Sequence, residues 1–306
     1  MNASFDVVII GAGPAGLAAA LYTGRARLKT LVLEKGIPGG QILLTDWIEN
    51  YPGFPDGIAP FDLMENFRKQ AVKFGAEIVA DEARQVENED KDWVVRGAGA
   101  SYRTRAIIIA TGSNYRRLGL PNEDRLIGRG VSYCATCDGP FFRERDIAVV
   151  GGGDTALMEA EFLSKFARTV HLIHRRDKFR GTKILQERVL ANAKIRIHWN
   201  AVAEEILGQD NVEGVVLRDV KAGTKSTVGV EGLFISVGMI PINDIVRGLV
   251  RLNEWGEIVV NESMETSAPG IFAAGDVIGG ASHQVSTAVG TGVRAALGVD
   301  EYLASR

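Results

Sequence analysis

The chain has 306 residues, of which 46% are hydrophobic and 24% charged, and its formal net charge at pH 7 is −3. This composition is typical of a globular protein, and the length allows one large or two medium-sized domains, of which we expect two. The slightly acidic balance excludes a broad cationic surface for nucleic acid or for an anionic membrane.

The chain opens with a predicted βαβ unit over residues 6–35: an apolar run, a glycine-rich turn, an alanine-rich helical stretch and a second apolar run. Gly11 allows a tight turn, Gly13 lets the backbone approach a pyrophosphate, and Gly16 permits close helix packing. Glu34 ends the second run and is placed to accept hydrogen bonds from a ribose diol, so we expect a nucleotide without a 2′-phosphate. Such a glycine turn also arises for packing alone.

The beginning of the sequence carries no sign of export. The first apolar run has no basic stretch before it, and glycines interrupt it well short of a membrane-spanning length. We therefore expect a cytoplasmic protein without a membrane segment.

The only two cysteines, Cys134 and Cys137, lie in the segment VSYCATCDGPFF. Two cysteines are too few for a four-thiolate zinc site, and the four histidines show no ligand spacing around them, so no metal is expected. A CxxC pair closes a small disulfide ring and can carry two electrons by thiol exchange. Asp138, which follows directly, is a candidate proton donor or acceptor for that exchange. The alternatives are two buried structural cysteines and an aspartate that caps a turn.

A second βαβ unit is predicted over residues 146–176, with the same order of elements and nearly the same length as the first. Gly151, Gly153 and Ala156 stand at the positions of the three glycines of the first unit. The duplication therefore predicts two nucleotide-binding units in one chain.

The second unit ends in HRRDKFR where the first ends in an acid. Arg175, Arg176 and Arg180 supply planar, permanently charged donors for a phosphate dianion, which is how a protein selects NADP over NAD. The alternative is a solvated basic edge. The first site suits an unmodified ribose diol and the second a ribose with a 2′-phosphate. This difference suggests FAD in the first unit and NADPH in the second.

The later segments define the domain organisation. Each unit is followed by a buried-looking strand that closes on a glycine, AIIIATGS at 106–113 and GLFISVG at 232–238. The closing segments PGIFAAGDV and STAVGTGVRAALGVDEYL have no counterpart in the second unit. We expect an α/β fold of two Rossmann-like dinucleotide-binding domains. The FAD domain spans 1–114 plus 243–306, and the NADPH domain, which carries the CxxC motif, is inserted at 115–242.

The motifs GAGPAG, GGQ, ENYPGFP, ATGS, CATCDG, GGGDTA, HRRDKFR and IFAAGDV cover nearly the whole chain, and in this order they resemble the low-molecular-weight thioredoxin reductases. The resemblance implies a homodimeric FAD enzyme in which NADPH reduces the flavin, the flavin reduces the Cys134–Cys137 disulfide, and the dithiol reduces thioredoxin. It also implies that Cys137 lies next to the flavin, that Cys134 attacks the partner disulfide, that Asp138 is the acid, and that the inserted domain rotates.

Motifs and resemblance together select the cofactor residues. The polar segment 39–55 contributes three of them, and Asp276 is either a ligand of the flavin's ribityl or phosphate side or a turn residue. For FAD the candidates are Gly11, Gly13, Pro14, Ala15, Gly16, Glu34, Lys35, Gly40, Gln41, Asn50, Thr111, Gly112, Asp276, His283 and Gln284. For NADPH they are Gly151, Gly153, Asp154, Thr155, Ala156, His174, Arg175, Arg176 and Arg180. The chain departs from the family at His283, where arginine is usual, and at Thr291, where an acid is common.

Other functions compete with this interpretation. A branch of the same family takes electrons from ferredoxin or reduced flavin, and the intact HRRDKFR argues against it. The reductase of a peroxide-scavenging system shares the core but carries further N-terminal redox domains. A ferredoxin-NADP reductase-like diaphorase needs no dithiol, and a redox sensor would not turn over. Another small disulfide protein could also replace thioredoxin as the acceptor.

Overall fold

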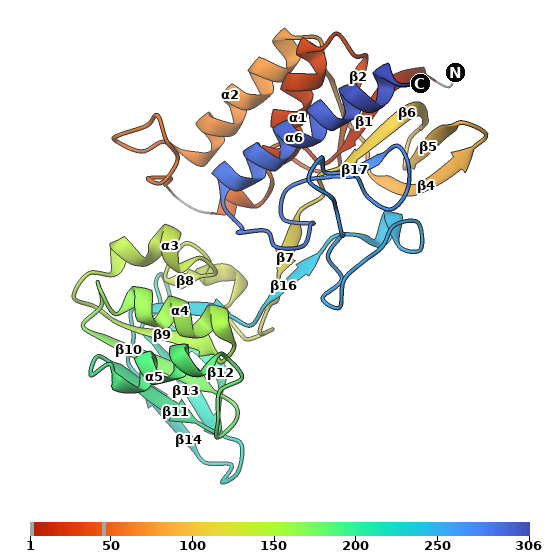
Figure 1. Ribbon diagram of the computed structural model, residues 1–306. Coiled ribbons are helices and arrows are strands. Elements are labelled where there is room, and N and C mark those ends of the chain that lie inside the picture. The colour runs from red at the N-terminus through yellow and green to blue at the C-terminus, as the bar shows by residue number, and fades with distance from the viewer. Residues whose placement is uncertain (1–2, 45–46) are drawn as a thin grey trace. The chain divides into compact units, whose positions relative to one another are not determined.

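The computed structural model describes residues 3–44 and 47–306 (Figure 1), so two residues of the glycine-rich segment, Thr45 and Asp46, lie outside the described part. The chain divides into two compact units. Unit 1 consists of Met1–Asn114 and Ile240–Arg306, and unit 2 of Tyr115–Met239. The chain returns to unit 1 at Ile240, close to the residue 243 expected from the sequence. Two short strands lie at the crossings, β7 (Ser113–Tyr115) and β16 (Met239–Pro241).

Unit 1 is built on a seven-stranded sheet in which β3, β2, β1 and β6 are parallel neighbours. The strands β4 and β5 extend the sheet in antiparallel fashion, and β17 pairs in parallel with the last residues of β6. The strand bounds are β1 (Ala3–Ile10), β2 (Thr30–Glu34), β3 (Glu77–Ala80), β4 (Ala83–Glu89), β5 (Asp92–Gly97), β6 (Ser101–Ile109) and β17 (Ile271–Ala273).

The central strands of unit 1 are continuous apolar runs because both faces of the sheet are covered. Ile9 of β1 and Ile108 of β6 are completely buried and lie side by side in register. The helices are α1 (Pro14–Arg25), α2 (Pro60–Lys73) and α6 (Val285–Ala304), with short 3-10 turns η1 (Gly40–Leu44) and η4 (Asp244–Val246). Helix α6 runs along α1 (Figure 1), so the C-terminal segment completes the core around the first glycine turn.

Unit 2 repeats this plan with a five-stranded parallel sheet of order β11-β10-β9-β15-β8. A separate antiparallel sheet has the order β12-β13-β14. The strand bounds are β8 (Val131–Ser132), β9 (Asp146–Gly151), β10 (Thr169–His174), β11 (Ile195–Trp199), β12 (Ala201–Leu207), β13 (Gly214–Asp219), β14 (Lys225–Val228) and β15 (Gly232–Ser236). The helices are α3 (Ala135–Asp138), α4 (Asp154–Leu163) and α5 (Lys183–Ala191), with 3-10 turns η2 (Asp124–Leu126) and η3 (Gly139–Phe142).

The duplication inferred from the sequence has the same topology in both units. In unit 1, β1 lies between β2 and β6; in unit 2, β9 lies between β10 and β15. Each glycine turn therefore leaves the carboxyl end of a central strand, where parallel α/β sheets bind nucleotides. The expected fold class, two Rossmann-like units, is confirmed.

Candidate active site

The first glycine turn is shaped by two different requirements. Gly11 has φ +106°, and a Cβ there would lie 2.3 Å from the Ala110 carbonyl oxygen, while a Cβ on Gly16 would lie 1.9 Å from that of Gly11. These glycines are needed for packing. At Gly13, which precedes α1, the nearest atom to an added Cβ would be the Gly40 Cα at 3.9 Å. Packing therefore does not explain Gly13, and its backbone remains open to a pyrophosphate.

Glu34 lies at the end of β2, beside this turn. Its Oε2 accepts a hydrogen bond of 2.8 Å from the Ala12 amide, and its Oε1 accepts one of 2.9 Å from the Gly36 amide. A carboxylate oxygen has more than one acceptor direction, so these bonds leave capacity for a ribose hydroxyl. Glu34 thus both fixes the turn and presents an acid to the cavity beyond it.

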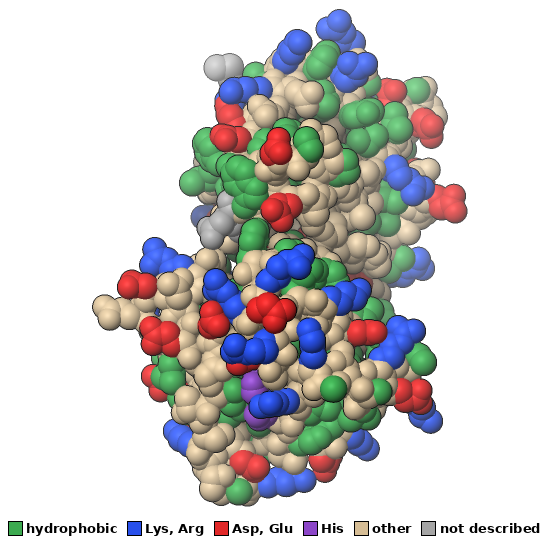
Figure 2. Space-filling view, turned by 90° about the vertical axis from the view of Figure 1, so that its left-hand side faces the viewer, with side chains coloured by type: hydrophobic (Ala, Val, Ile, Leu, Met, Phe, Trp, Pro, Cys, Tyr) green, Lys and Arg blue, Asp and Glu red, His purple; other side chains and the backbone are tan. Residues whose placement is uncertain are grey.

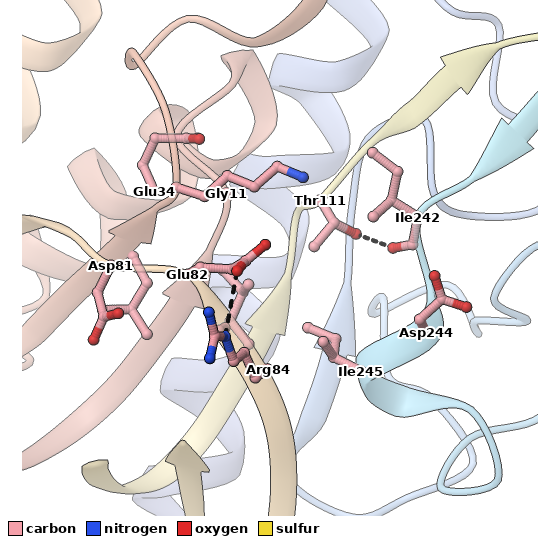
Figure 3. Close-up of a pocket in the computed structure, with 13 residues that line it drawn as sticks. Gly11, Glu34, Asp81, Glu82, Arg84, Thr111, Ile242, Asp244 and Ile245 are labelled. Carbon is pink, nitrogen blue, oxygen red and sulfur yellow. Dashed lines mark hydrogen bonds and ion pairs between the residues drawn. The ribbon is translucent and has the colours of Figure 1, made fainter. Parts of the chain in front are cut away.

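A cavity of about 330 Å³ opens beside Gly11 and Glu34 (Figure 3). Its size is within the range of small-molecule sites. Lys35 and Thr111, both expected from the sequence, contribute to its wall, and the Thr111 hydroxyl donates a 2.5 Å hydrogen bond to the Ile242 carbonyl oxygen. The full lining is Ile10, Gly11, Leu33, Glu34, Lys35, Asp81, Glu82, Ala83, Arg84, Thr111, Ile242, Asp244 and Ile245.

Seven of these residues come from two segments that sequence reasoning missed, 81–84 and 242–245. The first follows β3, whose carboxyl end lies at the same sheet edge as that of β2. Sequence reasoning could have found this segment from its position directly after a strand that lies parallel to β2 in the same sheet. The second segment reaches the cavity only through the chain's return to unit 1, for which the sequence carries no local signal.

Asp81 is a buried carboxylate that holds the end of the β5–β6 hairpin. It accepts hydrogen bonds from the Gly99 amide at 3.0 Å and from the Tyr102 hydroxyl at 2.9 Å. Burial raises the pKa of Asp81, but its backbone and Tyr102 hydrogen bonds outweigh this and lower the pKa overall. For Tyr102, burial and the Asp81 carboxylate raise the pKa to about 12. Asp81 is therefore an anion that shapes the cavity.

The other predicted FAD residues meet at the N-terminus of α6. The Asn50 side-chain amide donates to the Gln284 side-chain oxygen at 3.1 Å, across 234 residues of sequence. The His283 Nδ1 lies 3.6 Å from an Asp276 carboxylate oxygen, which raises the pKa of His283. The Thr291 hydroxyl accepts a hydrogen bond from the Gly275 amide at 3.0 Å. Asp276 is thus paired with the histidine that departs from the family pattern.

The remaining predicted FAD residues lie on α1, after β6 and on η1. Pro14 begins α1, Ala15 is buried beneath it, and Gly112 has φ +70° after β6. Gly40 and Gln41 form the start of η1, which has no buried residue.

The second glycine turn, in unit 2, divides its roles in the same way. A Cβ on Gly151 would lie 2.4 Å from the Ala156 Cβ, whereas one on Gly153, directly before α4, would meet no atom of a described residue within 4 Å. Asp154 accepts a hydrogen bond from the Thr182 amide at 2.7 Å, and Thr155 is exposed. Gly153 therefore offers open backbone at a helix N-terminus.

His174 lies inside unit 2 and does not join the arginines at the surface. It is 6% exposed, with Nδ1 2.9 Å from the Gly151 carbonyl oxygen and Nε2 2.9 Å from that of Lys178. The ring thus holds the glycine turn against the arginine loop. Ile173 of β10 and Leu33 of β2 hold equivalent register positions beside the central strand of their sheets. His174 and Glu34 directly follow them and therefore occupy equivalent places.

The three predicted arginines, Arg175, Arg176 and Arg180, are exposed, and none forms an ion pair with a described carboxylate. The acid within their loop, Asp177, is instead paired with Lys221 at 3.2 Å. Three guanidinium groups thus stand beside an open glycine turn without local neutralisation, which suits a phosphate dianion.

The redox pair forms a disulfide, Cys134–Cys137, with Cα atoms 5.3 Å apart. Cys134 caps α3, and its Sγ accepts a hydrogen bond of 3.2 Å from the Cys137 amide. Such a donor stabilises developing negative charge on sulfur. Asp138 is partly buried at the end of α3, and its Oδ2 accepts a 2.6 Å hydrogen bond from the Ser132 hydroxyl.

Glu159 of α4 is a further carboxylate, which sequence reasoning missed, and it lies near α3. Burial raises the pKa of Glu159, although hydrogen bonds from the Ser236 hydroxyl and the Ala135 amide oppose that rise. Glu159 of α4 therefore contacts the first residue of α3.

Among residues 3–44 and 47–306, no group of three or more metal-ligating side chains is present, and no helix is long and apolar enough to cross a membrane. On the face drawn in Figure 2, lysine and arginine side chains alternate with aspartate and glutamate. That face offers no continuous basic surface.

Comparisons with known proteins agree with this arrangement. Residues 5–292 match the family model described as pyridine nucleotide-disulphide oxidoreductase. Thioredoxin reductases of Streptomyces clavuligerus and Streptomyces coelicolor are 48% and 47% identical over 303 residues, which cover 98% of this chain and 94% of each relative. The crystal structure of thioredoxin reductase from Streptococcus pyogenes is similar with a TM-score of 0.93 and 45% identity, over 100% of both chains.

Proposed function

The chain belongs to the pyridine nucleotide-disulphide oxidoreductase family and, within it, to the thioredoxin reductases, and we propose which of its residues carry that reaction. The enzyme uses FAD and NADPH to reduce the disulfide of thioredoxin. The observation that carries the proposal is the Cys134–Cys137 disulfide. It lies in the same unit as an open glycine turn flanked by three arginines that form no ion pair with a described carboxylate.

Unit 1 holds FAD. The cavity at the end of β1 and β2 suits the adenosine part, with Glu34 accepting from the ribose diol and Gly13 admitting the pyrophosphate. We assign Asp276, which is paired with His283, to the ribityl or phosphate side of the flavin, as expected from the sequence. When bound, FAD supplies the two-electron chemistry that links a nicotinamide to a disulfide.

Unit 2 holds NADPH. Gly153 admits the pyrophosphate to the N-terminus of α4, and Arg175, Arg176 and Arg180 bind the 2′-phosphate. His174, whose two ring nitrogens face backbone carbonyls, positions the loop and does not contact phosphate itself.

In the disulfide, we assign Cys137 to the flavin side and Cys134 to attack on thioredoxin, as the family resemblance implies. Attack by the Cys134 thiolate forms a mixed disulfide with thioredoxin, breaks the partner disulfide and releases one thioredoxin thiolate, which takes up a proton. Attack by Cys137 on Cys134 then re-forms the Cys134–Cys137 disulfide and releases the second thiolate of thioredoxin. Asp138, at the end of the same short helix, is the group that exchanges this proton.

We further propose that the enzyme works as a cytoplasmic homodimer and that unit 2 changes orientation during turnover. Both proposals rest on the family resemblance, and the second also rests on unit 2 carrying both the redox pair and the NADPH arginines.

The test is turnover of the FAD-loaded protein with thioredoxin and a chromogenic disulfide, with NADPH, NADH or reduced ferredoxin as donor. We expect turnover with NADPH, and its loss in Cys134→Ser while NADPH still bleaches the flavin. Bleaching by ferredoxin or reduced flavin alone would move the enzyme to the branch without an NADPH site.

A further inference from the structure

Ser132 lies between the redox pair and Asp138. It is the last residue of β8, is 4% exposed, and is fixed in the sheet opposite Phe234 of β15. Its hydroxyl oxygen accepts a hydrogen bond from the Cys134 amide at 3.1 Å and lies 2.6 Å from Asp138 Oδ2. One side chain therefore contacts both the backbone of the exchanging cysteine and the acid assigned to serve it.

The single hydroxyl proton of Ser132 has two acceptors within reach. Asp138 Oδ2 lies at 2.6 Å and the Cys134 carbonyl oxygen at 3.4 Å. A hydrogen bond from a hydroxyl to a carboxylate is typically as short as the first contact, and the second is at the limit for a neutral bond. The proton is therefore directed at Asp138.

We propose that Ser132 is a positioning residue for the thiol chemistry: its hydroxyl orients Asp138 toward the redox pair and sets the pH at which Asp138 exchanges its proton. The proposal rests on the proposed function, because it requires Asp138 to be the acid–base group. No described hydrogen bond joins the Ser132 hydroxyl to either cysteine sulfur. We therefore do not assign Ser132 as a proton donor to a thiolate.

The direction of the effect follows from the charge. A hydroxyl donor stabilises the ionised carboxylate relative to the protonated acid, so its removal shifts protonation of Asp138 to higher pH. If Asp138 acts as an acid, the rate falls on the alkaline side of the profile, and the pH of that fall rises. If Asp138 acts as a base, the rate falls on the acidic side of the profile, and the pH of that fall also rises. Both roles give the same direction.

The experiment compares the pH profile of kcat for thioredoxin reduction in the wild type, Ser132→Ala, Ser132→Thr and Asp138→Asn. One limb of this pH profile should disappear in Asp138→Asn. We expect the same limb to shift to higher pH by about one unit in Ser132→Ala. Ser132→Thr retains the hydroxyl and should restore the wild-type position. The double variant Ser132→Ala/Asp138→Asn should match Asp138→Asn, because the serine acts through the aspartate.

Ser164→Ala is the matched control. Ser164 is also a buried serine of unit 2. Its hydroxyl donates to the Glu161 carbonyl oxygen and accepts from the Asn192 side-chain amide, neither of which belongs to the segment 132–138. Its pH profile should equal that of the wild type. Flavin content and bleaching by NADPH are measured on every variant to show that the fold is intact.

An unmoved or downward-shifted limb in Ser132→Ala, with the limb absent in Asp138→Asn, would overturn the role of Ser132 and leave the proposed function in place. A limb that persists in Asp138→Asn would remove the acid–base role from Asp138 and so overturn both.

Discussion

Glu34 and His174 occupy equivalent positions at the ends of β2 and β10, and both hold a glycine turn in place. Glu34 does so with a carboxylate that also faces the cavity, whereas His174 is turned inward. The sequence allows the charge difference between the two sites to be predicted. It does not show that His174 is buried, because that depends on Phe179 and Trp199, which pack around the ring.

The arginine assignment makes a prediction at this scale. Replacement of Arg176 by alanine should raise KM for NADPH by about 10- to 100-fold, because each lost charge-assisted hydrogen bond is worth roughly 1.5–3 kcal/mol. KM for NADH should not change, since NADH lacks the 2′-phosphate. Steady-state kinetics with both donors checks this. Arg188→Ala in α5, where the arginine pairs with Glu161 at 3.8 Å, is the control and should leave both values unchanged.

The contact between α1 and α6 shows how a glycine can serve packing. A Cβ on Gly292 of α6 would lie 2.2 Å from the Ala15 carbonyl oxygen, whereas one on Gly290 would have no neighbour within 4 Å in the described part of the chain. Alanine is normally the better helix former by about 1 kcal/mol. Gly290→Ala should therefore stabilise the enzyme by about 0.5–1 kcal/mol, and Gly292→Ala should destabilise it by roughly 2 kcal/mol. Urea unfolding of the FAD-loaded proteins measures both; equal effects would contradict the packing role.

The pair of strands β10 and β11 carries a pH-sensitive contact. His171 Nδ1 lies 2.9 Å from His198 Nε2, and burial, with the charges of His198 and Arg196, lowers the pKa of His171 to about 4; Asp146 opposes this. The unfolded ring binds a proton below about pH 6.5, but the folded ring does so only near pH 4. Stability should therefore fall as the pH drops between these values.

The loss should be on the order of 2 kcal/mol between pH 6.5 and pH 4. Urea unfolding at pH 7, 6 and 5 checks this against the double variant His171→Phe/His198→Leu, which should lose that part of the pH dependence. An unchanged slope in the double variant would assign the acid sensitivity to other groups.

The organisation of the whole chain could be predicted from its sequence to a large extent. Two glycine turns, each following an apolar run, identify β1 and β9, and the repeated closing strands identify β6 and β15. The walls of the cavity could not be predicted, because residues 81–84 and 242–245 reach it from distant parts of the chain. Ser132 was missed for a similar reason: its contact with Asp138 depends on the path of the chain around the disulfide.

The electron path through the molecule is tested most directly by counting electrons in an anaerobic reductive titration of the FAD-loaded enzyme. Flavin and disulfide each accept two electrons, so the wild type should take up about four per flavin and Cys134→Ser about two. A wild-type value of two, or a value of four that persists in Cys134→Ser, would contradict the proposal that the Cys134–Cys137 disulfide exchanges electrons with the flavin.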